Sequence, residues 1–223
     1  MKNVISKEFC ERIVERTHAL DSTRDQSFHK IFDGCPNFHR LIDHEVSRRY
    51  SLTAIKHATY YFPWNSDPLD LFGSFNEIWR VFKYFGGFPA RAFENNIPSD
   101  GVIDRIQIAQ YPAGVGELNR HIDPVKNQRV IIGLIMSKRG EEYQSGGFYY
   151  VDTNDRVIDV EDQLDIGDIL CCYPTVHHGV EIIDPDKQAN WSSVEGRWWL
   201  GPASVDSDHL RERMTASRVE ETR

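Results

Sequence analysis

The spacing of apolar residues changes near residue 100. Before that point, apolar positions recur at intervals of three and four, which is typical of amphipathic helices. After it, short runs rich in Val, Ile, Tyr and Trp are separated by turn-forming residues, which is typical of β-strands. The pattern predicts a mainly β protein with helices gathered in its N-terminal half.

The N-terminal region, residues 1–100, is predicted to be a helical support. Ser6 can cap a first helix whose apolar positions follow helical spacing, and a second helix is expected over residues 38–46. A third begins near Pro68 and ends at Gly86-Gly87. An aromatic-rich strand over residues 53–62 is expected before it.

The β-core is predicted over residues 102–205. Its strands are expected at 102–111, 129–136, 147–151, 156–160, 169–173, 178–183 and 196–200. Short strands at this spacing favour a sandwich or jelly roll, with the helices packed on one sheet. Residues 206–223 are charged and are interpreted as a tail or a docking helix, with Leu210 and Met214 one turn apart. The whole chain, 1–223, is interpreted as one domain.

Composition excludes several classes of partner. The chain has 26 Lys+Arg against 34 Asp+Glu, and the net charge of -8 repels nucleic-acid backbones. No apolar run approaches the roughly 20 residues of a membrane span, and no signal peptide is recognisable. The four cysteines lack C-x-x-C spacing and are expected to be reduced. We expect a cytoplasmic protein with a small-molecule partner, and the oligomeric state is left open.

The segment RHIDPV places His121 and Asp123 two residues apart. In a strand, such side chains point the same way, so an imidazole and a carboxylate can face one point. A third ligand is available in TVHHGVEII, where His177 or His178 begins a strand. Two histidines and one carboxylate form the facial triad of non-haem iron sites. On these residues alone, an exposed polar pair at a strand edge is an equally good interpretation.

Seven short elements follow one another between Arg105 and Gly201. They are Tyr111-Pro-Ala-Gly114, His121-Ile-Asp123, Arg129-Val-Ile-Ile-Gly-Leu-Ile, Ser145-Gly146-Gly147, Gly167-Asp168-Ile-Leu, His178-Gly-Val180 and Gly196-Arg197-Trp-Trp. In this order they resemble the Fe(II)/2-oxoglutarate-dependent dioxygenases, and most of all their prolyl-4-hydroxylase-like branch. The resemblance implies a double-stranded β-helix that uses Fe(II), 2-oxoglutarate and O2 to hydroxylate a C–H bond, with succinate and CO2 as coproducts.

The resemblance also implies an iron-ligand set. His121 and Asp123 match the first two ligands of the family. The third is His178 rather than His177, because the family's His-x-Val pattern matches His178-Gly179-Val180. The carboxylate of Asp123 favours hydroxylation over halogenation, although desaturation and cyclisation use the same triad.

Arg197 matches the arginine that binds the far carboxylate of 2-oxoglutarate in the family. It lies 19 residues after His178, further than is usual there, and Lys187 is nearer the usual distance. Residues 184–193 are therefore interpreted as an inserted loop beside the mouth of the barrel. Tyr111 matches a tyrosine that bonds the cosubstrate, and Gln107 shares its face of the predicted strand.

Candidate substrate contacts are Arg129, Glu117, Tyr149 and Trp199. Arg129 follows Asp123 by six residues and is expected to bind a substrate carboxylate inside the barrel. The predicted substrate is a small metabolite such as an amino acid. The alternatives are a prolyl-type hydroxylase of proteins or peptides, and a cupin-like metal protein that does not use 2-oxoglutarate.

Overall fold

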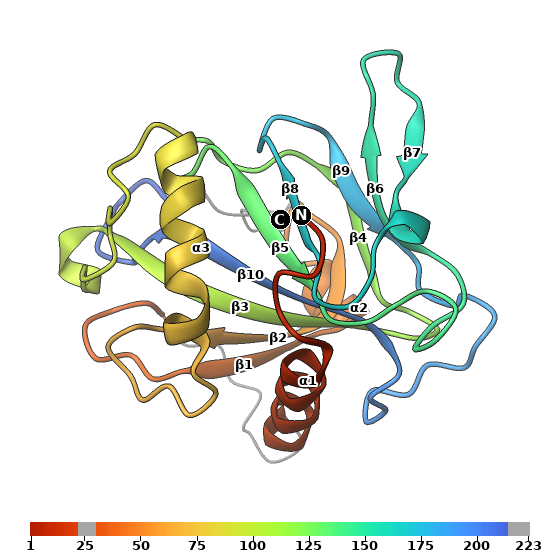
Figure 1. Ribbon diagram of the computed structural model, residues 1–223. Coiled ribbons are helices and arrows are strands. Elements are labelled where there is room, and N and C mark those ends of the chain that lie inside the picture. Colours follow the sequence, from red (N-terminus) through yellow and green to blue (C-terminus); the bar gives the residue numbers. More distant parts are fainter. Residues whose placement is uncertain (22–29, 214–223) are drawn as a thin grey trace, which may run out of the picture.

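The computed structural model describes residues 1–21 and 30–213 (Figure 1). These residues contain three α-helices, ten β-strands and two short 3-10 turns. The helices are α1 (Lys7–Asp21), α2 (His44–Ser47) and α3 (Leu71–Phe85). The strands are β1 (Phe38–Ile42), β2 (Ala54–Tyr61), β3 (Val102–Pro112), β4 (Glu117–His121), β5 (Ile131–Ile135), β6 (Gly147–Val151), β7 (Val157–Asp159), β8 (Ile169–Cys172), β9 (His178–Glu181) and β10 (Gly196–Asp206).

The strands form a curled, antiparallel sheet in which β2 joins two layers. The larger layer runs β1-β2-β3-β10-β5-β8, and the smaller runs β2-β4-β9-β6-β7. Residues 57–61 of β2 pair with β3, whereas Ala54 and Ile55 pair with β4. Buried side chains of β3 and β9 meet between the layers. The predicted double-stranded β-helix is thus confirmed.

Strand alternation gives the larger layer two different faces. Ile106 and Ile108 of β3 and Trp198 and Leu200 of β10 pack on one face against Phe75 and the other apolar residues of α1 and α3. Figure 1 shows α3 crossing these strands. The intervening residues of β3 and β10 point the other way, into the barrel.

The helix predicted over residues 38–46 is wrong. Phe38–Ile42 is strand β1, which pairs with β2, and only His44–Ser47 is helical. Phe38 packs in one buried cluster while His39 is buried on the opposite face against His57. Burial on both faces removes the two-residue alternation that identifies an exposed strand. Asp43 begins the short helix by accepting a hydrogen bond from the Val46 N–H.

The other N-terminal elements agree with the sequence. Ser6 caps α1 through Phe9 N–H, and β2 falls within residues 53–62. Helix α3 begins at Leu71, three residues after Pro68, because Asp67 accepts hydrogen bonds from its first two N–H groups.

Two strands, β4 and β10, differ from the sequence-based prediction. Strand β4 was not separately predicted, and β10 extends six residues beyond the predicted end at Leu200. Met214 and the rest of the proposed docking helix lie outside the described residues. Among the helices described, none has the length and apolar character needed to cross a membrane.

A buried histidine pair supports the outer face of the larger layer. His57 Nε2–H donates to the Trp191 carbonyl at 3.1 Å, so its Nδ1 carries the lone pair and accepts from His39 Nε2–H at 3.0 Å. Burial lowers the pKa of His57 to about 4. This contact also places Trp191, and with it part of the inserted loop, on the outer face rather than at the predicted position beside the mouth.

We expect His57 to make the fold sensitive to mild acid. Its pKa is about 4 in the folded protein and near 6.5 in the unfolded chain, so the unfolded chain takes up the proton first. The contribution is complete above pH 6.5 and falls by about 2 kcal/mol toward pH 4.5. Urea unfolding at both pH values should show this loss in the wild type and a shallower dependence in His57→Gln. Equal dependence in the two proteins would contradict the assignment.

Candidate metal centre

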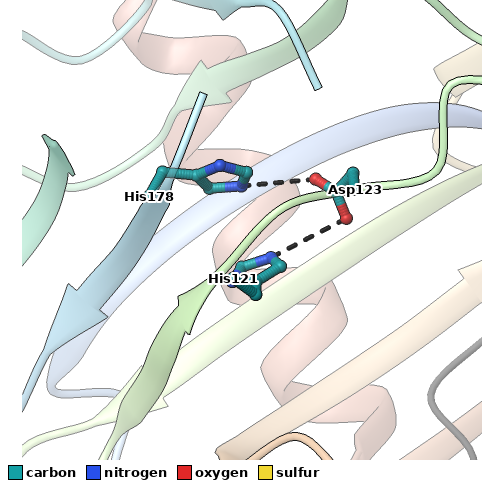
Figure 2. A group of neighbouring side chains, drawn as sticks. All are labelled: His121, Asp123 and His178. Atoms are coloured by element: carbon teal, nitrogen blue, oxygen red, sulfur yellow. Dashed lines mark ion pairs between the residues drawn. The ribbon is translucent and has the colours of Figure 1, made fainter. Parts of the chain in front are cut away.

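Three side chains of metal-ligand type converge between β4 and β9 (Figure 2). His121 is the last residue of β4 and pairs directly with His178, the first residue of β9. Asp123 follows in the coil after β4, where its N–H donates to the Pro174 carbonyl. The ligand atoms of all three residues lie within 4.8 Å of one another. Asp123 therefore reaches the site through this turn and not through the strand alternation that the sequence predicted.

Backbone carbonyls fix the direction of both imidazoles. His121 Nδ1 lies 2.9 Å from the Asn119 carbonyl and His178 Nδ1 lies 2.8 Å from the Val176 carbonyl, so each Nδ1 carries a proton. Both Nε2 atoms then face the Asp123 carboxylate, at 3.7 Å and 3.2 Å. A backbone acceptor on the far ring nitrogen is the usual support of a metal-binding histidine.

The electrostatics of the group fit a bound cation. Burial acts to raise the pKa of Asp123, but the hydrogen bond from His178 and the charge of His121 hold it below its usual value. Burial opposes protonation of His178, yet the contact with Asp123 raises its pKa. Without a metal, a proton joins these two groups, and a divalent cation can take its place. Two nitrogens and one carboxylate on one side of a metal are the donor set of non-haem Fe(II) sites.

The three residues line a cavity of about 380 Å³ between the two layers. Its floor is the inner face of the larger layer, and Phe148 and Leu118 belong to its walls. Tyr111, Gln107, Arg197 and Trp199, which the sequence singled out, all line it as well. Burial raises the pKa of Tyr111 to about 12, so its hydroxyl is a hydrogen-bond donor at neutral pH.

Arg197 is held in the cavity by a buried glutamate. Its Nε donates to Glu161 Oε1 at 2.6 Å, and the two side chains are 4% and 1% exposed. Glu161 also accepts from the Tyr143 hydroxyl and the Phe148 N–H, both at 2.6 Å. These contacts leave the terminal guanidinium nitrogens of Arg197 available to a ligand. Glu161 lies in a polar stretch, VEDQLD, that gave no signal in the sequence.

Three predicted substrate contacts lie elsewhere. The Arg129 guanidinium stacks on Phe88 at 5.2 Å, with Nη1 directed at the Gly86 carbonyl, so it does not line the main cavity. Glu117 and Tyr149 do not line it either, because their neighbours Leu118 and Phe148 do and alternate residues of a strand face opposite sides.

Both sequence alternatives to the site residues are on the surface. His177 is exposed, and its carbonyl accepts from the Val151 N–H. Lys187 lies in the inserted loop and forms ion pairs of 3.1 Å with Asp184 and Glu195. Neither side chain lines the cavity, whereas His178 and Arg197 do.

Comparison with solved structures identifies the fold. A Pseudomonas putida prolyl-4-hydroxylase matches with a TM-score of 0.52 and 12% identity over 91% of this chain and 88% of that chain. AviO1 from Streptomyces viridochromogenes matches at 0.52 and 11%, covering 95% and 90%. A Trichoplax adhaerens prolyl hydroxylase, in complex with a hypoxia inducible factor peptide fragment, matches at 0.51 and 11%, covering 92% and 82%. No protein-family model and no curated protein matches the sequence. The chain has the double-stranded β-helix fold found in 2-oxoglutarate oxygenases.

Replacing His178 and His177 one at a time should show which of the two histidines binds the metal. His178→Ala is expected to weaken Mn(II) binding by at least about a hundredfold, because loss of one ligand leaves only two. His177→Ala, the matched control, should bind Mn(II) like the wild type. Calorimetric titration of each protein with Mn(II) measures the effect. Loss of affinity in His177→Ala alone would reassign the ligand.

Proposed function

We propose that this protein is a non-haem Fe(II)/2-oxoglutarate-dependent oxygenase that hydroxylates a C–H bond of a small molecule. The observation that carries the proposal is the convergence of His121, Asp123 and His178 in a cavity that also contains Arg197. With iron and 2-oxoglutarate bound, O2 supplies the oxidation of the substrate while 2-oxoglutarate is converted to succinate and CO2.

The protein's part is to bind, orient and exclude water. His121, Asp123 and His178 would hold the metal, and three protein ligands would leave coordination positions for the cosubstrate and O2. Arg197 offers a planar cation to a carboxylate, and Glu161 fixes its orientation. Tyr111 lies opposite Arg197 in the β3–β10 register, at the same end of the cavity. These two residues are the proposed site for the far carboxylate of 2-oxoglutarate.

A cupin-like metal protein without 2-oxoglutarate is the alternative from another class. It requires the same three ligands but gives no reason to bury an arginine in the cavity. Arg197 is only 3% exposed, and keeping it buried requires a glutamate partner. This arrangement favours the oxygenase, because an arginine beside a metal can bind a dicarboxylate cosubstrate.

Hydroxylation of a peptide is the second candidate within the oxygenase class. It is favoured by the likeness to two prolyl hydroxylases, one of them solved with a peptide fragment. The cavity of about 380 Å³ favours the small molecule, since it is of the size that holds a cosubstrate and a metabolite.

Turnover of 2-oxoglutarate tests the proposal. Fe(II)-loaded protein in air is expected to form succinate from 2-oxoglutarate, slowly without substrate and faster with it. Amino acids and proline-containing peptides, added separately, show which class stimulates the reaction. No succinate from metal-loaded protein under any of these conditions would refute the oxygenase assignment.

The same assay tests the role of Arg197. Arg197→Met should raise the KM for 2-oxoglutarate by about tenfold or more, because a charge-assisted hydrogen bond is lost. Lys187→Met is the matched control and should leave the KM unchanged. Since Arg197→Met strands a buried glutamate, the double variant Arg197→Met/Glu161→Gln provides a neutral pair if the single variant does not fold. An unchanged KM in both Arg197 variants would place the carboxylate site elsewhere.

A further inference from the structure

Two cations on the floor of the cavity have no carboxylate partner. Lys56 of β2 and Arg105 of β3 both line the cavity, and Lys56 is only 9% exposed. Within the described residues, no ion pair or hydrogen bond joins the Lys56 ammonium to another group. The buried Nε of Arg105 likewise has no hydrogen-bond partner there. Buried charges are normally paired, so within the described chain these two cations lack the anionic partner that such charges usually have.

A neutral donor lies beside them. Gln107 is 9% exposed, shares the inward face of β3 with Arg105, and has a buried Nε2 without a partner in the described part of the chain. Tyr60 pairs with Gln107 across β2 and β3, and the Arg105 guanidinium lies over the Tyr60 ring at 4.6 Å. The ring supports one face of the guanidinium and leaves its N–H edge available. The floor therefore presents donors and no acceptor to match them.

The charge of the cavity is opposite to that of the protein. The chain carries a net charge of -8, yet of the described residues that line the cavity, Asp123 alone is acidic. The positive charges there are Arg40, Lys56, Arg105, Arg197 and Arg213. Arg197 is paired with Glu161 and Arg213 with Asp208. A metal bound to Asp123 would take up the one negative charge, which leaves Lys56 and Arg105 to an incoming anion.

Arg105 is displaced along β3 from the Arg197 end of the cavity. In the β3–β10 register, Arg197 lies opposite Tyr111, whereas Arg105 lies opposite Ala203. Arg105 and Tyr111 are six positions apart, which corresponds to about 20 Å of strand. A five-carbon dicarboxylate is too short to engage both ends. Lys56 lies nearer the Arg197 end, because its ammonium is 5.5 Å from the centroid of the Tyr111 ring.

We propose that Arg105 and Gln107 bind a carboxylate of the molecule that is oxidised. The substrate is then a small organic acid, a class that includes free amino acids. This inference rests on the proposed function and specifies its substrate. Phe38, Leu118 and Phe148 line the same cavity and would contact the apolar part of such a molecule.

Binding of carboxylates and their neutral amides tests the inference without turnover. The full-length protein is loaded with Mn(II) and saturating 2-oxoglutarate in the absence of oxygen. The probes are butyrate, benzoate and N-acetylglycine, each compared with its primary amide, together with inorganic phosphate. Calorimetry and thermal unfolding measure binding. At least one carboxylate is expected to bind about tenfold more tightly than its amide.

Variants show which side chains are responsible for the preference for a carboxylate over its amide. Arg105→Gln should weaken carboxylate binding by about tenfold, while the affinity for 2-oxoglutarate stays within about twofold. Arg105→Lys keeps the charge and should retain part of the affinity. Arg156→Gln makes the Arg105→Gln change at an exposed arginine, paired with Asp152, and should match the wild type.

Several results would overturn the inference. In the wild type, these are equal binding of every carboxylate and its amide, or a response to phosphate alone. A variant that loses affinity for 2-oxoglutarate but keeps its affinity for the probes would also contradict it. So would a variant that unfolds at a lower temperature but still binds the probes, because these residues would then serve only the stability of the fold. Failure of the proposed function is visible separately, because the wild type would then bind no 2-oxoglutarate in the presence of Mn(II).

Discussion

The two-residue alternation of the central strands β3 and β10 is the constraint on which the rest of the molecule depends. One face of these strands carries Ile106, Ile108, Trp198 and Leu200 into the helix-packed core. The other face must then point into the barrel, and it carries the polar residues of the cavity. A shift of one residue in this register would exchange the two faces, placing charges in the core and isoleucines in the site. Stability of the core and geometry of the site therefore have one origin.

The described part of the structure contains two kinds of buried cation, one with a carboxylate partner and one without. Arg197 is fully compensated by Glu161, which in turn is held by Tyr143 and the Phe148 N–H. Such a network fixes one orientation of the guanidinium. Lys56 and Arg105 lack this compensation within the described residues, at a cost in stability. Polar groups left without partners inside a cavity are typical of positions that a ligand completes.

The sequence was informative where a pattern has one physical meaning. Order and spacing pointed to the three residues that converge between β4 and β9, to Arg197 in the cavity and to most strands, because each depends on local residues and a recurring arrangement. The strand Phe38–Ile42 was misread because burial on both faces hides its period. Arg129 was misassigned to the cavity because five residues of coil and bend lie between it and Asp123, and chain distance does not give direction there.

Other site features left no local signal at all. Glu161 reaches Arg197 across 36 positions of sequence, and nothing in its own segment distinguishes it from a surface acid. Lys56 and Arg105 are single cations in apolar strands, and only the pairing of β2 with β3 reveals that both face the cavity. The fold shows which strands pair, but neither the composition nor the spacing of apolar residues predicts that pairing.

The central claim is that His121, Asp123 and His178 hold an iron that binds 2-oxoglutarate beside Arg197. Anaerobic titration of the Fe(II)-loaded protein with 2-oxoglutarate, followed by visible absorption, tests it most directly. A weak charge-transfer band that saturates with 2-oxoglutarate and is absent in His178→Ala but present in His177→Ala is the expected result. Fe(II) binding with no such band at any 2-oxoglutarate concentration would contradict the account.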